Sequence, residues 1–475
     1  MRYFFEEEVK TLHDCKNDRF VVGVPGYKQV LVDKIGRIVS DEYKYIKPRS
    51  DGYFEAEIDY KRNILIDGSG RVIVGECLDI DHFTDDGIAL VTKQDKKKCW
   101  VTKDGFEFGK EYKNVGVFAG GFGSVQLEND KWVFIDKNFN VVSPQYDKVS
   151  FFDGGYALVQ QDKDIFVIDT EFKIRSGPYA GVLCVKDGIV AACEKNPENP
   201  KLKYAYYTVD GKKLGKSYKL IYTFKNGISR VSTLEGENFI DMQGNELLEK
   251  PALMASNFGP RFAYIGKFDE NGEHTFMLID RNGKPASDWF AYIGGVEDDK
   301  PFAIKSHKAK YLNNKGVTVG KGYKRLTGLS EGVAHYESSN DKWTFIFEDG
   351  HESAEAYDHA GGFSCGYAVV KNGEVYDAIT KAENKLSVIS KVAFEIEREP
   401  IKVLSVCEKY EDDPEILKFL CEHAIEVLDY AIQSDEYDAG QKAQFADDKK
   451  MIEVLKIKTM SQIPEKKSGD DGWEW

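Results

Sequence analysis

Apolar and polar residues alternate within short segments of this chain, and a turn closes each segment. In Phe151–Val159, Ala157 and Val159 fall on one face at a spacing of two residues. After a polar gap comes a second apolar run, Ile165–Ile168, which ends at Asp169. Alternation of this kind predicts two antiparallel β-strands that bury one face, and plentiful Gly, Tyr and Phe suit short strands joined by tight turns.

The same two-strand pattern recurs along the chain at a regular spacing. An Asp or Asn closes the second strand, and we assign nine such anchors: Asp33, Asp67, Asp104, Asp136, Asp169, Asp210, Asp241, Asp280 and Asn313. The eight intervals from residue 33 to residue 313 cover 280 residues, a mean of 35. Self-similarity at such a period indicates a repeat protein, here of about ten to eleven units.

The residues after most anchors predict a hairpin turn. In Asp33–Gly36 and Asp241–Gly244, for example, a glycine follows the aspartate by three residues. The aspartate side chain can accept a backbone N–H, while glycine readily adopts a positive φ. The copies at Asp136 and Asp169 lack this glycine, so we expect their turns to differ.

A single unit of this kind is too small to bury its own apolar face, so neighbouring units must stack. We therefore predict a mainly β repeat protein that is either β-propeller-like or an open β-superhelix. Ten or eleven units exceed the usual four to eight blades of a propeller. A ring architecture would thus require two rings, and the sequence does not choose between these arrangements.

One copy carries a more specific signature than the others. Residues 131–136 read Lys-Trp-Val-Phe-Ile-Asp, and Tyr146 and Phe151 follow them. Two weaker copies of this signature occur: Lys-Cys-Trp at 98–100 and Lys-Trp at 342–343.

These residues resemble the bacterial WG-repeat family, and the resemblance extends over roughly residues 19–378. Val133 stands where the family has the glycine after tryptophan, so the chain resembles a diverged member. The resemblance implies a β-propeller or β-solenoid that serves as an interaction surface. It brings no catalytic residues with it.

The hydrophobic period changes from two to about 3.6 after residue 379, which predicts helices. Asp413 and Pro414 have the residue types of a helix start. In a last helix, residues 441–460, we place Met451, Val454/Leu455 and Lys458 on one side. The predicted organisation is a β-repeat domain at 1–379, a helical domain at 380–460 and a flexible, acidic, tryptophan-containing tail at 461–475. The helices either cap the last repeat or form a partner-binding module.

Charge and cysteine content narrow the class of protein further. The net charge is −15, so a phosphate backbone would be repelled and nucleic-acid binding is not expected. No stretch approaches the ~18 apolar residues of a membrane span, and the first residues lack a signal sequence. The eight cysteines form no Cys-x-x-Cys pair, which is typical of reduced thiols and indicates a cytoplasmic protein.

Local motifs for catalysis, cofactors or metals are not apparent in the sequence. Eight histidines lack zinc-binding spacing. Cys421 and His423, with Cys407, form the nearest candidate set of metal donors, but residues two apart on a helix point in different directions. We therefore assign no catalytic, cofactor-binding or metal-binding residue.

These observations favour a non-enzymatic protein–protein interaction scaffold or regulatory subunit whose partner is another protein. Partner contacts are predicted for an inserted loop, at Asn196, Asn199 and Lys203, and for the tail, at Trp473 and Trp475. A small-molecule or glycan-binding propeller is one alternative. An enzyme whose site is assembled from distant repeats is the other.

Overall fold

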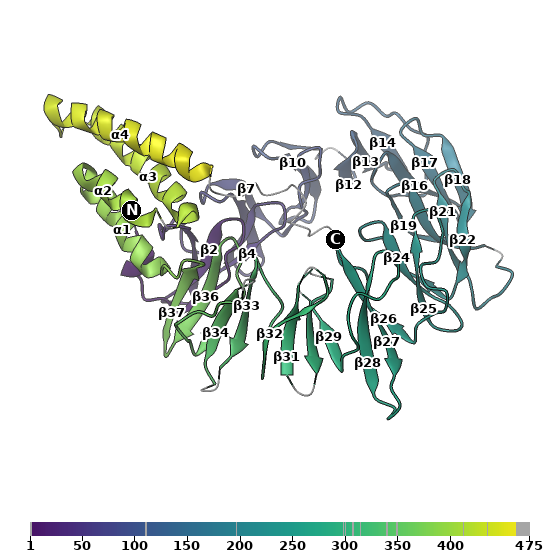
Figure 1. The fold of residues 1–475 in the computed structure, drawn as a ribbon. Coiled ribbons are helices and arrows are strands. Elements are labelled where there is room, and N and C mark those ends of the chain that lie inside the picture. Colours follow the sequence, from purple (N-terminus) through teal and green to yellow (C-terminus); the bar gives the residue numbers. More distant parts are fainter. Residues whose placement is uncertain are drawn as a thin grey trace. The chain divides into compact units, whose positions relative to one another are not determined.

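A computed structural model describes most of the chain. The residues outside the description are 1, 110–111, 196, 298, 300, 306–307, 314, 339–340, 348–349, 412, 435 and 462–475, together with the side chains of 319–321 and 415. The described part contains eleven small sheets followed by a group of helices (Figure 1). The predicted fold class, a mainly β repeat protein with a C-terminal α-helical module, is confirmed.

Each sheet is an antiparallel meander, because strands that are adjacent in the sheet are also consecutive in the chain. The first five sheets comprise β1 (Thr11–Leu12), β2 (Arg19–Val24) and β3 (Lys28–Asp33); β4 (Tyr45–Pro48), β5 (Phe54–Asp59), β6 (Arg62–Ile66) and β7 (Val72–Cys77); β8 (Asp79–Ile80), β9 (Ile88–Thr92), β10 (Lys98–Thr102) and β11 (Glu107–Phe108); β12 (Asn114–Ala119), β13 (Phe122–Gln126) and β14 (Trp132–Ile135); and β15 (Lys148–Val149), β16 (Tyr156–Gln161), β17 (Asp164–Asp169) and β18 (Ile174–Tyr179).

The remaining six sheets follow the same plan. They comprise β19 (Gly181–Lys186), β20 (Ile189–Cys193), β21 (Tyr204–Thr208) and β22 (Lys213–Tyr218); β23 (Leu220–Ile221), β24 (Ile228–Ser232) and β25 (Glu237–Asp241); β26 (Met254–Ala255), β27 (Phe262–Phe268) and β28 (His274–Asp280); β29 (Tyr292–Gly294), β30 (Phe302–Lys305), β31 (Lys308–Leu312) and β32 (Thr318–Tyr323); β33 (Val333–Glu337) and β34 (Trp343–Phe347); and β35 (His359–Ala360), β36 (Tyr367–Asn372) and β37 (Val375–Thr380).

The helical part begins six residues after the last strand. It contains α1 (Leu386–Arg398), η2 (Pro400–Lys402), α2 (Val403–Cys407), η3 (Glu408–Tyr410), α3 (Pro414–Gln433) and α4 (Ala439–Met460), and one further 3-10 turn, η1 (Phe4–Glu6), lies near the N-terminus. The chain divides into two compact units, and the helices belong to the same unit as the first and last sheets. That first unit takes in 1–75, 341–344 and 355–475, and the second takes in 76–340 and 345–354.

The turn that closes the second strand is the most regular feature of the repeat. In the turn at Asp241, the side-chain Oδ1 accepts the backbone N–H groups of Gln243 and Asn245 at 2.9 and 2.8 Å. Gly244 donates its N–H to the Asp241 carbonyl and has a φ of +92°. The predicted chemistry of these turns is therefore confirmed.

Two expectations about the turns were wrong. Asp136 and Asp169 make the same side-chain contacts as the other anchors, and Phe139 and Phe172 occupy the left-handed position with φ of +64° and +62°. Phe172 packs against Phe122 and Phe134 of the preceding repeat, and this packing offsets the cost of a positive φ for a residue with a Cβ atom.

Two of the nine assigned anchors were also wrong. The turn near Asp104 is anchored by Thr102, whose Oγ1 accepts the Phe106 N–H, and the turn near Asp210 is anchored by Thr208 in the same way. With these corrections eleven equivalent turns lie between residues 33 and 380, at a mean spacing of about 35 residues. They are centred on Asp33, Asp67, Thr102, Asp136, Asp169, Thr208, Asp241, Asp280, Asn313, Phe347 and Thr380.

Neighbouring sheets share their apolar cores, as the stacking argument predicts. Phe134 and Tyr146 of one repeat pack with Phe152, Ala157 and Ile168 of the next, all of them buried. The rings of Phe134 and Phe152 lie 5.0 Å apart in an edge-on arrangement, which is a favourable geometry for aromatic pairs. Burial between copies is therefore the main source of stability in the β-repeat region.

Candidate functional site

The helices pack on the first and last repeats in one continuous core. Buried residues of this core come from β2 and β3, from β36 and β37, and from α1 to α4. In Figure 1 the four helices lie beside the strands labelled β2, β36 and β37. Residues from the two ends of the repeat array are joined here: the Tyr367 hydroxyl donates to the Lys34 carbonyl at 2.5 Å, and its ring lies 5.2 Å from that of Phe20.

Two capping interactions set the start of the long helices. The Asp413 side chain accepts the Ile416 N–H at the start of α3, with Pro414 in the first turn. At the start of α4 the Asp438 carboxylate accepts the Gln441 N–H, and the Gln441 side chain accepts the Asp438 N–H in return. These contacts satisfy N–H groups that would otherwise lack partners, so they fix where each helix begins.

Helix α4 has a well-buried inner face. Phe445, Ile452 and Thr459 are 1%, 0% and 2% exposed. At 100° per residue these three positions fall within about 40° of one direction. Lys449 and Lys456 tie the same helix to α3 through ion pairs with Asp429 and Glu422.

The outer face of α4 also carries apolar side chains, among exposed charged residues such as Lys450 and Glu453. Met451, Val454, Ile457 and Met460 are 54%, 66%, 69% and 50% exposed. Their directions on the helix centre on the side opposite to the buried face. The side on which we had placed Met451 and Val454 is therefore the solvent-facing one, and the sequence expectation for α4 did not distinguish the two faces.

A surface helix of a soluble protein ordinarily buries one apolar stripe and exposes a polar one. The C-terminal half of α4 departs from this rule, because apolar side chains lie on both sides of it. Single exposed apolar residues are common and need no explanation, but a contiguous row is a mark of a binding surface. We call Met451, Val454, Ile457 and Met460 the α4 outer face.

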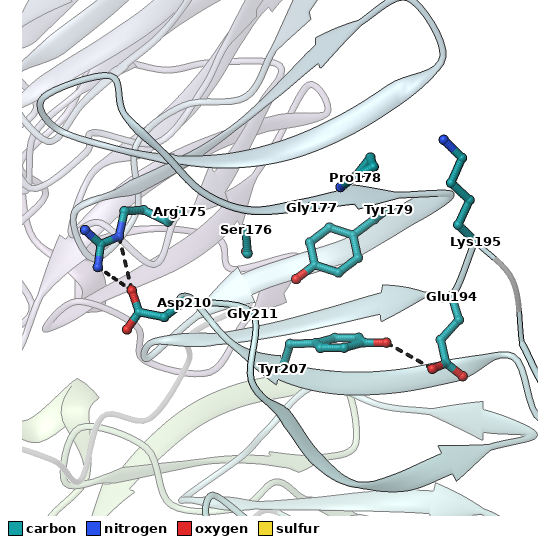
Figure 2. Close-up of a pocket in the computed structure, with 10 residues that line it drawn as sticks. All are labelled: Arg175, Ser176, Gly177, Pro178, Tyr179, Glu194, Lys195, Tyr207, Asp210 and Gly211. Atoms are coloured by element: carbon teal, nitrogen blue, oxygen red, sulfur yellow. Dashed lines mark hydrogen bonds and ion pairs between the residues drawn. The ribbon is translucent and has the colours of Figure 1, made fainter.

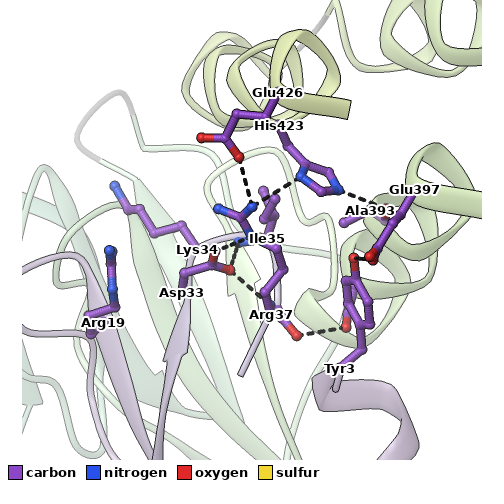
Figure 3. Close-up of polar contacts among 12 residues, drawn as sticks. Tyr3, Arg19, Asp33, Lys34, Ile35, Arg37, Ala393, Glu397, His423 and Glu426 are labelled. Atoms are coloured by element: carbon purple, nitrogen blue, oxygen red, sulfur yellow. Dashed lines mark hydrogen bonds and ion pairs between the residues drawn. The ribbon is translucent and has the colours of Figure 1, made fainter. Parts of the chain in front are cut away.

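A buried polar junction holds the helices on the first repeat (Figure 3). Arg37 follows the turn at Asp33 and donates to the Asp33 carboxylate at 2.7 Å and to Glu426 of α3 at 3.1 Å. Arg37 also lies 3.1 Å from His423 Nδ1, while His423 Nε2 lies 3.1 Å from the Ala393 carbonyl. With Nε2 donating to that carbonyl, Nδ1 accepts from Arg37 and the imidazole is neutral.

Burial lowers the pKa of His423, and the neighbouring positive charge of Arg37 lowers it further. Protonation of His423 would place two positive charges side by side inside the junction. The junction is therefore built for the neutral histidine, and the contact between α3 and the first repeat depends on that state.

The turn of the first repeat touches α1 directly. The Gly36 carbonyl accepts hydrogen bonds from the Phe4 N–H at 2.7 Å and from Ser390 Oγ of α1 at 3.1 Å. Gly36 has a φ of +81°, and a Cβ atom built on it would lie 2.4 Å from the Ser390 Cβ. Only glycine fits this close approach of turn and helix.

Two pairs of thiols occur in this unit. The thiol of Cys365, in the loop before β36, donates to the Cys15 carbonyl at 3.6 Å, and the neighbouring Cys15 thiol lowers the pKa of Cys365 to about 6. Burial raises the pKa of Cys15 itself. Cys407 and Cys421 form a second pair between α2 and α3, so Cys421 contacts a thiol rather than joining His423. Among the described residues, no group of three or more His, Cys, Asp or Glu side chains could hold a metal ion.

The inserted loop that the sequence singled out lies between β20 and β21. The Asn199 side chain accepts the Lys201 N–H within this loop, and the Lys203 carbonyl accepts the Glu194 N–H at 2.8 Å. Both residues thus stabilise the loop itself. The other predicted partner-binding residues, Asn196, Trp473 and Trp475, lie outside the described residues.

A cavity of about 490 Å³ begins at the base of this loop (Figure 2). Its walls are the end of β18, the residues that follow β20, and Tyr207 of β21. Sequence reasoning pointed to the loop but missed the cavity, because the lining residues come from two different sheets and share no motif.

Comparison with known families assigns the repeat. A family model described as "WG containing repeat" matches residues 134–163 and 343–376. The chain contains WG repeats in these two segments. The first matched segment begins inside β14 and runs to β16 and the turn after it, and the second runs from β34 to β37. Each match thus covers parts of two neighbouring sheets, as the shared cores of these repeats would require.

Other comparisons add little to this assignment. Solved structures similar to this chain include the computationally designed Ika8 protein (12% identity, 59% of this chain and 95% of that one, TM-score 0.28). BamB from Moraxella catarrhalis is 12% identical, with 64% of this chain and 96% of that one covered and a TM-score of 0.28. The WD40 β-propeller domain of Doa1 is 11% identical, with 49% of this chain and 91% of that one covered and a TM-score of 0.23. These TM-scores are too low to place the chain in any of those folds. No curated protein matches the chain significantly.

One test bears on membrane insertion. Within the described residues, no helix has the length and apolar character that a transmembrane span requires.

Proposed function

We propose that this protein is a non-enzymatic protein-interaction scaffold whose partner binds the α4 outer face. The observation that carries the proposal is the apolar character of both sides of α4. Its inner side is covered by α3 and the rest of the helical core, whereas Val454 and Ile457 are each about two-thirds exposed. Burial of such side chains is the main driving force in protein association.

The expected partner surface is the apolar stripe of an amphipathic helix. Successive side chains of the α4 outer face lie three residues apart, so they form a ridge that crosses the helix surface obliquely. A second helix laid against this ridge would cover it with its own residues at positions i, i+3, i+4 and i+7. The core beneath α4 keeps the ridge rigid, so little ordering is needed on binding.

The β repeats have a supporting role in this proposal. They give α1 and α3 a broad packed surface through β2, β3, β36 and β37, and their loops offer additional contact area. No motif for catalysis was found in the sequence, and this absence is the basis for proposing a scaffold rather than an enzyme.

Partner capture from cells that express the protein tests the proposal. We expect the full chain to retain a specific protein, and the double variant Val454→Glu/Ile457→Glu to lose at least tenfold in affinity for it, because two charges would be buried in an apolar interface. Leu183→Glu/Leu234→Glu is the matched control, since these leucines are 60% and 57% exposed in the other compact unit.

If both double variants lose affinity for the partner equally, or if neither loses affinity, the assignment of the α4 outer face is overturned. Light scattering of the purified chain checks a different occupant. If the wild type dimerises and Val454→Glu/Ile457→Glu is monomeric, then the ridge binds a second copy and the scaffold proposal fails in its present form.

A further inference from the structure

The cavity beside the inserted loop has the features of a binding site for a small ligand. It lies within the second compact unit, between the sheet that ends with β18 and the sheet that contains β20 and β21. Its volume of about 490 Å³ is in the range of sites that hold metabolite-sized ligands. Ten residues line it: Arg175, Ser176, Gly177, Pro178, Tyr179, Glu194, Lys195, Tyr207, Asp210 and Gly211.

One buried hydroxyl group in this cavity, that of Ser176, lacks a hydrogen-bond partner of ordinary geometry among the described residues. Ser176 is 7% exposed. The Tyr179 hydroxyl lies beside it: burial raises the pKa of Tyr179, which is 6% exposed, and a weak hydrogen bond with Ser176 partly offsets that rise. A buried polar group without a partner is costly, and each such group in a native structure calls for an explanation. A ligand hydroxyl that both donates and accepts would hydrogen-bond to Ser176 and Tyr179 together.

The charges around the cavity are already neutralised by one another. Arg175 pairs with Asp210, with its Nε 3.1 Å from the carboxylate. Lys195 pairs with Asp164 at 2.6 Å, and Glu194 pairs with Lys213 at 2.8 Å. An anionic or cationic ligand would have to displace one of these partners, so the arrangement favours a ligand without charge.

The far end of the cavity presents a third hydroxyl in a fixed orientation. Tyr207 donates to Glu194 Oε1 at 3.0 Å, which leaves its oxygen free to accept a hydrogen bond. In Figure 2 the hydroxyl of Tyr179 points toward Ser176 and Asp210, whereas that of Tyr207 points toward Glu194. Burial alone would raise the pKa of Glu194, but hydrogen bonds from Lys213, Ser217 and Tyr207 outweigh it and the pKa falls below the ordinary value. Glu194 therefore remains ionised and holds Tyr207 in place.

The half-buried ring of Tyr207 supplies an apolar surface between these polar ends, and the buried ring of Tyr179 packs against it. Their centroids lie 5.2 Å apart at an angle of 52°. Aromatic rings offer flat apolar faces against which the C–H face of a sugar ring can pack. The cavity thus has hydroxyl groups at both ends, charges that are already paired, and an aromatic ring between them. These features suit a ligand that is uncharged and carries several hydroxyl groups.

We propose that this cavity binds a neutral polyhydroxylated ligand, a saccharide ring, with Ser176 and Tyr179 meeting one edge and Tyr207 the other. This site is separate from the α4 outer face and does not depend on the scaffold proposal. A free monosaccharide and one residue of a longer glycan share this chemistry, and the test below distinguishes them.

Saturation-transfer NMR and calorimetric titration with the full chain test the proposal, with D-glucose as the free sugar and cellobiose as the short glycan. We expect binding of at least one of them, with Ser176→Ala weakening it about tenfold through loss of one hydrogen bond. Tyr207→Phe should weaken it by a similar factor. Tyr292→Phe, whose ring is 48% exposed in the same unit, is the matched control and should leave affinity unchanged.

Stronger binding of cellobiose than of glucose would assign the site to glycan chains, and the reverse would assign it to free sugars. The Ser176→Ala chain also has a second readout. Because the substitution removes an unsatisfied hydroxyl, the thermal midpoint should stay the same or rise, so weaker binding cannot be attributed to unfolding. Tighter binding of glucose 6-phosphate than of glucose, no binding of either neutral sugar, or equal effects of all three substitutions would overturn the proposal.

Discussion

Replacing Gly36 with alanine tests the packing of α1 on the first repeat. The Cβ atom of alanine would lie 2.4 Å from the Ser390 Cβ and 3.0 Å from the Ser390 Cα, and the φ of this position is +81°. Contacts this short cannot be relieved by rotating a side chain, because one of the atoms belongs to the helix backbone. The helix or the turn must shift.

The structure allows the cost of the positive φ to be separated from the cost of the steric clash. A positive φ costs an alanine roughly 1 kcal/mol, and overpacking of this kind costs about 1–3 kcal/mol more. We expect Gly36→Ala to lower the free energy of unfolding by about 2–4 kcal/mol. Gly26→Ala is the matched control, because Gly26 has a φ of +79° but no atom within 4 Å of an added Cβ; it should cost only about 1 kcal/mol.

Urea unfolding followed by the helical circular dichroism signal is the appropriate assay, since every α-helix in the described chain lies after residue 385. The double variant Gly36→Ala/Ser390→Gly removes the two closest atoms, Cβ and Oγ of Ser390, but also the hydrogen bond from that Oγ to the Gly36 carbonyl, so it should recover part of the difference from Gly26→Ala. Equal losses for Gly36→Ala and Gly26→Ala would refute the reasoning, because α1 would then not rest on this turn.

Three further predictions concern the same unit. Tyr367→Phe leaves the buried Lys34 carbonyl without its 2.5 Å donor and should cost about 1–2 kcal/mol in urea unfolding, whereas Tyr27→Phe, at a side chain 95% exposed, should cost nothing measurable. Glu383→Gly should raise stability by about 0.5–1 kcal/mol, because Glu383 holds a φ of +62° in a turn where most repeats have glycine; an unchanged or lower urea midpoint would contradict this. The folded-state pKa of His423 is below its unfolded value, so the unfolded chain binds more protons and stability should fall as the pH drops below about 6.5. A His423→Gln variant should show a smaller fall than the wild type in urea titrations over that range, and an identical pH dependence would rule out the proposed role of the junction.

The regular part of the fold could be predicted from the sequence because it rests on local chemistry. An aspartate that accepts two backbone N–H groups and a glycine three residues later are both visible in Asp241–Gly244. The prediction of the turn residues failed where a different residue type accepts the same N–H group or adopts the same positive φ. Threonine replaces aspartate at Thr102, and phenylalanine replaces glycine at Phe139 and Phe172 because tertiary packing compensates for the strained backbone.

The features that bear on function were less accessible to sequence reasoning. In α4, apolar residues surround the helix, so the period alone does not show that Ile452 points inward and Val454 outward. The contact between Tyr367 and Lys34 joins residues 333 positions apart, and no local pattern records it. The cavity at Ser176 depends in the same way on two sheets meeting side by side.

Chemical trapping of the natural cysteines tests the packing of the first repeat on the last most directly. Thiols that already lie beside one another need little movement to form a disulfide, and Cys407 and Cys421 provide an internal reference for such a pair. After mild oxidation by a hydroperoxide under native conditions, mass spectrometry of the unreduced tryptic digest should find Cys15 linked to Cys365. Cys407 linked to Cys421 without a Cys15–Cys365 peptide, or Cys365 linked to another cysteine, would contradict the contact between the two ends of the repeat array.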